Sequence, residues 1–170
     1  VSVVRVAAQA KYPARAMLIA AMNPCPCGNY GSKVQPCRCT EKEIRRYLGR
    51  ISGPLLDRID IQLQISAVPV REISAPAQEE SSAAIRRRVQ AARECQRARF
   101  GDTAARCNAE MTSRQVTEIC RLDETCQTLL ERACERYSMS MRAVNRTLKV
   151  ARTIADLAGA KEIGKAHLLE

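Results

Sequence analysis

Four cysteines stand in two close pairs, Cys25-Pro-Cys27 and Cys37-Arg-Cys39, and their thiols could hold a metal ion. Glycine, asparagine and proline lie between the pairs, and these residues favour tight turns. A turning chain can bring four thiolates around one point, and four sulfurs at tetrahedral geometry make a closed structural zinc site. Two disulfides, which need an oxidising compartment, or four free thiols are the alternatives. We predict structural zinc at Cys25, Cys27, Cys37 and Cys39.

Asn23 directly follows the apolar run Met17–Met22, which suits a strand covered on both faces, as in a parallel sheet. Pro24 then ends the run. Ligands of open α/β sheets bind beyond the carboxyl ends of the strands, so Asn23 could orient a water or a phosphate oxygen there. The alternative is an ordinary turn asparagine before a proline.

Arg58 lies between a predicted short turn or helix over residues 54–58 and a predicted half-buried strand, Ile59–Val68, in which apolar and polar residues alternate. An exposed arginine at such a rigid edge could reach a phosphate on a neighbouring subunit, as an arginine finger does. The alternative is a salt bridge to Asp57 or Asp60.

Arg142 begins a long predicted helix that Ser140 caps and that ends at Gly159. A cation near a helix N-terminus gains nothing from the helix dipole, whereas an anion is favoured there. The position therefore suggests a phosphate contact, with a solvated basic face as the alternative. Lys11 is expected near the tip of a hairpin with strands at residues 1–4 and 10–13, where it could touch a DNA backbone.

The composition limits the classes of function. The net charge is +10, which suggests either a polyanionic partner (nucleic acid or nucleotide phosphates) or a solvated basic surface. The sequence contains one histidine and no GxxxxGK[ST] phosphate-binding loop, so we expect neither a histidine-based nucleophile set nor ATP hydrolysis by this chain alone. No apolar run approaches the ~18 residues of a membrane span, and we predict a cytoplasmic protein with no membrane partner.

The elements that position these residues change character near residue 68. Before it, the strands and the cysteine loop are followed by a helix over residues 41–49, with Thr40 and Glu43 forming a capping box. After it, the patterns predict only helices: residues 79–100, then further helices beginning after Thr112, Asp123 and Ser140. We predict an α+β chain with one domain at 1–68, a linker at 69–77 and a helical domain at 78–170.

Several of these segments together resemble the magnesium-chelatase-like AAA+ ATPases. The segments are Tyr12-Pro-Ala-Arg, Ala20-Ala-Met-Asn-Pro-Cys-Pro-Cys-Gly, Arg50-Ile-Ser-Gly-Pro-Leu-Leu-Asp-Arg-Ile-Asp-Ile and the helix from Ser140 to Leu157. Within this family the chain is most similar to the ComM type, which is associated with bacterial natural transformation and DNA branch migration. The resemblance implies the C-terminal part of an AAA+ α/β domain with a zinc-binding insertion, followed by a helical lid.

The resemblance also implies a role for each residue. Asn23 falls at sensor 1, which positions the attacking water, and Arg58 at the arginine finger, which acts on the next subunit's ATP. Arg142 falls at sensor 2, which in this family contacts a nucleotide across the subunit interface. Lys11 lies in a hairpin that faces the DNA channel in related helicases. The P-loop and the carboxylates that bind Mg²⁺ would precede Val1, so ATP and Mg²⁺ are expected in a longer protein.

The leading interpretation is therefore part of a hexameric ATPase motor, whose partners are DNA and identical subunits. A zinc-stabilised basic module that binds nucleic acid without being a motor is the first alternative. A magnesium-chelatase subunit is the second, and the two cysteine pairs argue against it.

Overall fold

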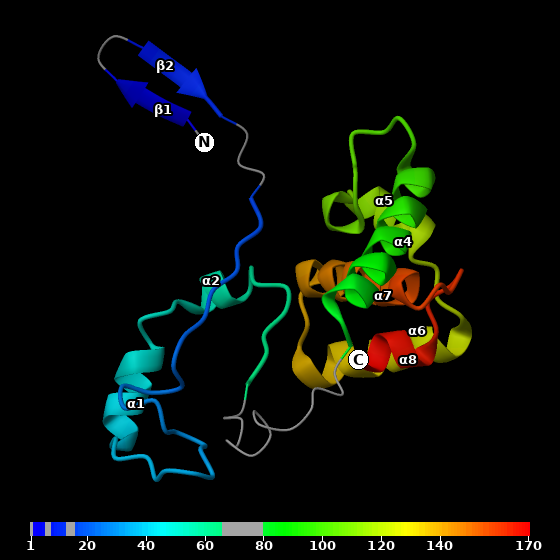
Figure 1. The fold of residues 1–170 in the computed structure, drawn as a ribbon. Helices are drawn as coiled ribbons and strands as arrows, with labels where there is room; N and C mark the ends of the chain where they lie inside the picture. Colours follow the sequence, from blue (N-terminus) through cyan, green and yellow to red (C-terminus); the bar gives the residue numbers. More distant parts are fainter. Residues whose placement is uncertain (1, 6–7, 13–15, 66–79) are drawn as a thin grey trace. The chain divides into compact units, whose positions relative to one another are not determined.

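The computed structural model describes residues 2–5, 8–12, 16–65 and 80–170. The chain divides into two compact units, Val1–Ile51 and Ser52–Glu170, which are considered separately (Figure 1). The linker predicted at 69–77 lies outside the described residues.

The first unit begins with an antiparallel hairpin of β1 (Ser2–Arg5) and β2 (Ala8–Lys11). The register pairs Arg5 with Ala8 and Ser2 with Lys11. The hairpin was predicted, but its second strand begins earlier than expected, because only two residues separate the paired Arg5 and Ala8. Lys11 therefore lies at the open end of the hairpin, opposite Ser2, and the prediction that placed it near the tip is wrong.

Helix α1 (Glu41–Leu48) begins as its sequence predicts. The Thr40 hydroxyl accepts from the Glu43 N–H at 3.4 Å, and the Glu43 carboxylate accepts from the Thr40 N–H at 2.8 Å. The N–H and hydroxyl of Thr40 stabilise the charged carboxylate and lower the pKa of Glu43. Ile44 is the buried residue of this short helix.

Two predicted strands do not form. The run Met17–Met22 and residues Ile59–Ile65 have irregular backbone, and their apolar side chains are exposed except for the half-buried Ile59; Met17 is 85 % and Leu63 is 81 % accessible. The reason lies in pairing, since a parallel strand needs neighbours reached by crossover connections. Among the described residues only β1 and β2 form a sheet, so these runs have no strand beside them. The remainder of the second prediction, residues 66–68, lies outside the described residues.

In the second unit the described residues from 80 onward are mainly helical, and residues 52–65 form the segment that carries Arg58. That segment contains the short helix α2 (Gly53–Leu56). The following elements are α4 (Ser82–Phe100), the 3₁₀ turn η1 (Asn108–Glu110), α5 (Ser113–Ile119), α6 (Glu124–Tyr137), α7 (Met141–Leu157) and α8 (Lys165–Leu169). The four predicted helices are confirmed as α4 to α7. The sequence reasoning missed η1 and α8, which are too short to show a period.

Helix α7 is the centre of this unit and packs against α4, η1, α5 and α8 (Figure 1). The core is aliphatic apart from one phenylalanine, as the low aromatic content requires: Phe100, Ala105, Met111, Val116, Cys120, Ala151, Ala155 and Ile163. Helix α4 ends at Gly101, whose φ of +49° favours glycine. None of the helices in the described parts of the chain is long and apolar enough to cross a membrane.

Candidate functional site

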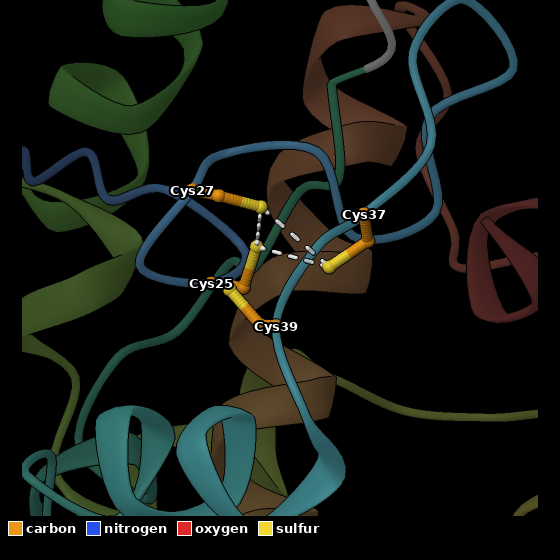
Figure 2. Close-up of side chains that lie close together, drawn as sticks. All are labelled: Cys25, Cys27, Cys37 and Cys39. Atoms are coloured by element: carbon orange, nitrogen blue, oxygen red, sulfur yellow. Dashed lines mark hydrogen bonds between the residues drawn. The ribbon is translucent and has the colours of Figure 1, made fainter.

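The sulfur atoms of Cys25, Cys27, Cys37 and Cys39 turn toward one another and all lie within 4.8 Å (Figure 2). Cys25 Sγ lies 3.4 Å from Cys27 Sγ and 3.7 Å from Cys37 Sγ, and the sulfurs of Cys27 and Cys37 are 3.6 Å apart. These separations are much longer than a disulfide bond, and all nine cysteines of the chain are free. Tetrahedral coordination with Zn–S bonds of 2.3 Å would place the sulfurs ~3.8 Å apart, so the cluster has the dimensions of a metal centre.

A tight turn shapes the first cysteine pair. The Gly28 N–H donates to the Cys25 carbonyl at 3.0 Å, and Gly28 has a φ of +81°, which side-chain-bearing residues rarely adopt. This turn directs Cys27 back beside Cys25, which is fully buried. Gly28, one of the turn residues on which the zinc prediction was based, therefore helps to place the Cys25 and Cys27 side chains next to each other.

The electrostatics of the cluster also suit a metal. The backbone N–H groups of Arg38 and Asn29 lower the pKa of Cys27 to about 6, because they stabilise its thiolate. Desolvation and the neighbouring sulfurs raise the pKa of Cys39 to about 12. Four crowded thiolates repel one another, and a divalent cation would remove that repulsion. The donor set and its surroundings therefore fit a cation that prefers sulfur.

Asn23 lies just before the cysteine cluster in the first unit and is exposed. Its side-chain amide lies 4.0 Å from the position that a Cβ on residue 28 would occupy, so Asn23 borders the Gly28 turn. It does not follow a strand, contrary to the sequence expectation, because the run before it has irregular backbone.

Arg58 is exposed in the second unit, just after α2. Its Nη1 donates to the Pro54 carbonyl oxygen. Within the described part of the chain it forms no ion pair with Asp57 or Asp60, the partners considered in the sequence analysis. Asp60 instead pairs with Arg146 of α7, with 2.9 Å between Asp60 Oδ1 and Arg146 Nε.

Arg142 lies in the first turn of α7 and is exposed. The Ser140 hydroxyl caps this turn by accepting from the Ala143 N–H at 3.2 Å. No ion pair or hydrogen bond of the Arg142 side chain occurs among the described residues, and none joins Arg142 to Arg58. The structure thus gathers the four cysteines, whereas Asn23 and Lys11 are exposed positions of the first unit and Arg58 and Arg142 are exposed positions of the second.

The sequence analysis missed a buried polar network in the second unit. Asp156 of α7 accepts from both terminal nitrogens of Arg99, from Arg152 Nε at 3.0 Å and from Asn108 Nδ2 at 2.8 Å. Arg152 also donates to the carbonyls of Ala160 and Lys161 at 2.6 and 2.8 Å. The network ties α4, η1 and the loop before α8 to α7.

A signal for this network was present in the sequence. Arg152 and Asp156 each follow a core alanine, Ala151 and Ala155, on the long helix predicted to begin after Ser140. Their i, i+4 spacing is equally typical of exposed pairs, which made them inconspicuous. His167, the histidine for which no catalytic role was expected, accepts from the Gly164 N–H at 2.9 Å and caps α8.

The chain matches two known protein families. The C-terminal family of magnesium chelatase subunit ChlI matches residues 79–170, and the magnesium chelatase subunit ChlI family matches residues 1–73. The chain belongs to the magnesium chelatase family. The resemblance stated from the sequence motifs is therefore confirmed, and with it the wider AAA+ relationship.

Two curated relatives in this family cover nearly the whole chain. It is 38 % identical to the competence protein ComM of Haemophilus influenzae and 42 % identical to the uncharacterized protein YifB of Salmonella typhimurium, in each case over 167 residues, 98 % of the chain. The chain spans 32 % of the length of each of these relatives.

Proposed function

We propose that this chain is the C-terminal part of a cytoplasmic, hexameric AAA+ ATPase that moves DNA strands, as the ComM resemblance implies. Asn23 acts as sensor 1, Arg58 as the arginine finger and Arg142 as sensor 2. The helical unit around α7 serves as the lid. ATP and Mg²⁺ bind the longer protein, and hydrolysis between subunits moves the hairpins that carry Lys11 along DNA.

The observation that carries this proposal is that the Arg58 guanidinium is exposed and forms no ion pair among the described residues. Among the described residues, neither Asp57 nor Asp60, the acidic residues beside it in the sequence, forms an ion pair with it, and Asp60 is already held by Arg146. An exposed guanidinium whose partner in the described part of the chain is the Pro54 carbonyl remains available to neutralise the charge that develops on a transferred phosphoryl group. A finger acts on the adjacent subunit, so exposure is what the role requires.

The same proposal assigns zinc to the cysteine cluster. Zn²⁺ favours four thiolates at tetrahedral geometry and leaves no position for a substrate, so its task would be structural. It would fix the loop that follows Asn23 and thereby restrict the position of that side chain.

The test is Arg58→Ala in the longer protein that contains the P-loop. Removal of a finger should reduce ATP turnover by about 10³-fold or more and spare ATP binding, since the residue contacts nucleotide from the neighbouring subunit. Arg132→Ala, which removes an exposed arginine from α6, is the matched control. Retained turnover in Arg58→Ala would refute the assignment.

A basic DNA-binding module without motor activity is the second candidate. The net charge of +10 and the exposed position of Lys11 favour it. This module would bind DNA in the absence of ATP and lose affinity steeply with salt.

A further inference from the structure

Arg146 joins α7 to the segment that carries Arg58. Its Nη2 donates to the Ile59 carbonyl at 2.6 Å, and its Nε lies 2.9 Å from Asp60 Oδ1. The Arg146 side chain is only 25 % exposed, so it is enclosed between the two elements. A planar guanidinium can make both contacts at once, which a lysine ammonium on a flexible stem would not reproduce.

The Arg146 contact lies close in sequence to both Arg58 and Arg142. The Ile59 carbonyl belongs to the residue directly after Arg58, and Arg146 lies one helical turn after Arg142 on α7. A single side chain therefore connects the backbone beside Arg58 to the helix that presents Arg142.

Packing between the segment and α7 leaves a hollow of about 280 Å³, which is lined by Leu56, Asp57 and Gln62 from the segment and by Thr147, Val150 and Ile154 from α7. The Arg146 contacts lie beside this hollow and join the segment to the helix there. The other side-chain hydrogen bonds among the described residues of the segment are internal: Arg58 donates to the Pro54 carbonyl and Gln62 Nε2 to the Leu56 carbonyl at 3.3 Å.

We propose that Arg146 is a positioning residue that fixes the Arg58 segment to α7, so that Arg58 and Arg142 take up their places together. The roles of Arg58 and Arg142 rest on the proposed function, whereas the contact itself does not. Asp60 is 59 % exposed, and a pair of this kind adds little to overall stability. Its loss should release the segment without unfolding the helices.

Amide hydrogen exchange on the 170-residue chain tests the contact. The N–H groups of Asp57, Arg58 and Ile59 donate within the segment and report its order. Arg146→Ala, which removes both contacts, should speed their exchange by about tenfold, and Asp60→Asn, which removes only the exposed pair, by about two- to fivefold, while α7 amides and the melting temperature change little. Arg132→Ala should leave all of these rates unchanged. Wild-type exchange in both Arg146→Ala and Asp60→Asn would overturn the proposal.

ATP turnover by the longer protein tests the positioning role. Arg146→Ala should lower kcat about tenfold or more with ATP affinity unchanged, and the exchange of charges in Asp60→Arg/Arg146→Asp should restore part of kcat. An unchanged kcat in Arg146→Ala, with turnover lost in Arg58→Ala, would overturn the positioning role and leave the proposed function intact. Full turnover in Arg58→Ala would remove the finger assignment and the positioning role with it, while the exchange rates would still decide whether the contact exists.

Discussion

Arg152 and Asp156 lie one turn apart on α7 and form a buried ion pair, with 2.9 Å between Arg152 Nη2 and Asp156 Oδ1. Arg152 is 2 % and Asp156 is 5 % exposed. The cost of removing these charges from water is offset because Arg99 and Asn108 also donate to the Asp156 carboxylate and the Ala160 and Lys161 carbonyls accept from Arg152. The second unit is thus organised around a charge cluster as well as an aliphatic core.

Asp156→Asn should strongly destabilise the second unit. The change leaves the buried Arg152 and the partly buried Arg99 without their counter-charge, and breaking one partner of a buried pair costs about 3–5 kcal/mol. Urea unfolding followed by far-UV circular dichroism would measure the loss. Asp102→Asn, at an exposed loop position, should change stability by less than about 0.5 kcal/mol. A similar stability for both variants would show that the network contributes little.

The stability of the second unit should fall in acid because of the same carboxylate. Burial by itself raises the pKa of Asp156, but the hydrogen bonds from Arg99 and Asn108 and the charges of Arg99 and Arg152 outweigh it, and the pKa is lowered. A lowered folded-state pKa means that the stabilisation is complete above the unfolded value of about 4 and is lost as the pH falls through the folded value. The urea concentration at the unfolding midpoint, measured between pH 7 and pH 2, should therefore decrease once the pH falls below about 4.

Asp156→Asn should flatten this acid dependence. Some slope will remain, because the pKa of Asp123, which caps α6 by accepting from the Cys126 N–H at 2.7 Å, is lowered as well. An unchanged slope in Asp156→Asn would assign the acid sensitivity to other carboxylates.

The elements that the sequence predicted correctly are those with local causes. Thr40, Thr112, Asp123 and Ser140 each cap a helix through their own side chain, and a cap needs only the next three residues. The cysteine cluster could be predicted from the sequence for the same reason, since its residues lie within positions 25–39 and turn residues connect them.

Apart from the hairpin register and the short elements η1 and α8, the errors concern partners distant in sequence. Met17–Met22 reads as a buried strand, but strand formation depends on neighbours that its own residues do not specify. The environment of Asp156 was invisible for a related reason: Arg99 and Asn108 are 57 and 48 residues away. The contact of Arg146 with the Ile59 carbonyl spans 87 residues, and no periodicity reports it.

Purified protein should contain one zinc ion per chain, held by the cysteine cluster. Cys37→Ser should abolish stoichiometric zinc by elemental analysis, because three sulfurs no longer complete the tetrahedron. Cys134→Ser, on α6, should retain it. Since structural zinc can contribute on the order of 10 kcal/mol of local folding free energy, chelation should also disorder the first unit around residues 25–39. Metal-free wild-type protein prepared without chelator would contradict this prediction.

Lys11→Ala should weaken the binding of duplex DNA and make it less sensitive to salt. A lysine that neutralises one phosphate contributes about 0.9 to the slope of log affinity against log salt, so the variant's slope should fall by about that amount. The matched control is Lys42→Ala, which removes the same charge from an exposed position of α1 in the same unit. Fluorescence anisotropy with labelled duplex at 50 to 200 mM salt would measure both variants. Equal losses in Lys11→Ala and Lys42→Ala would indicate a diffuse charge effect and no contact by the hairpin.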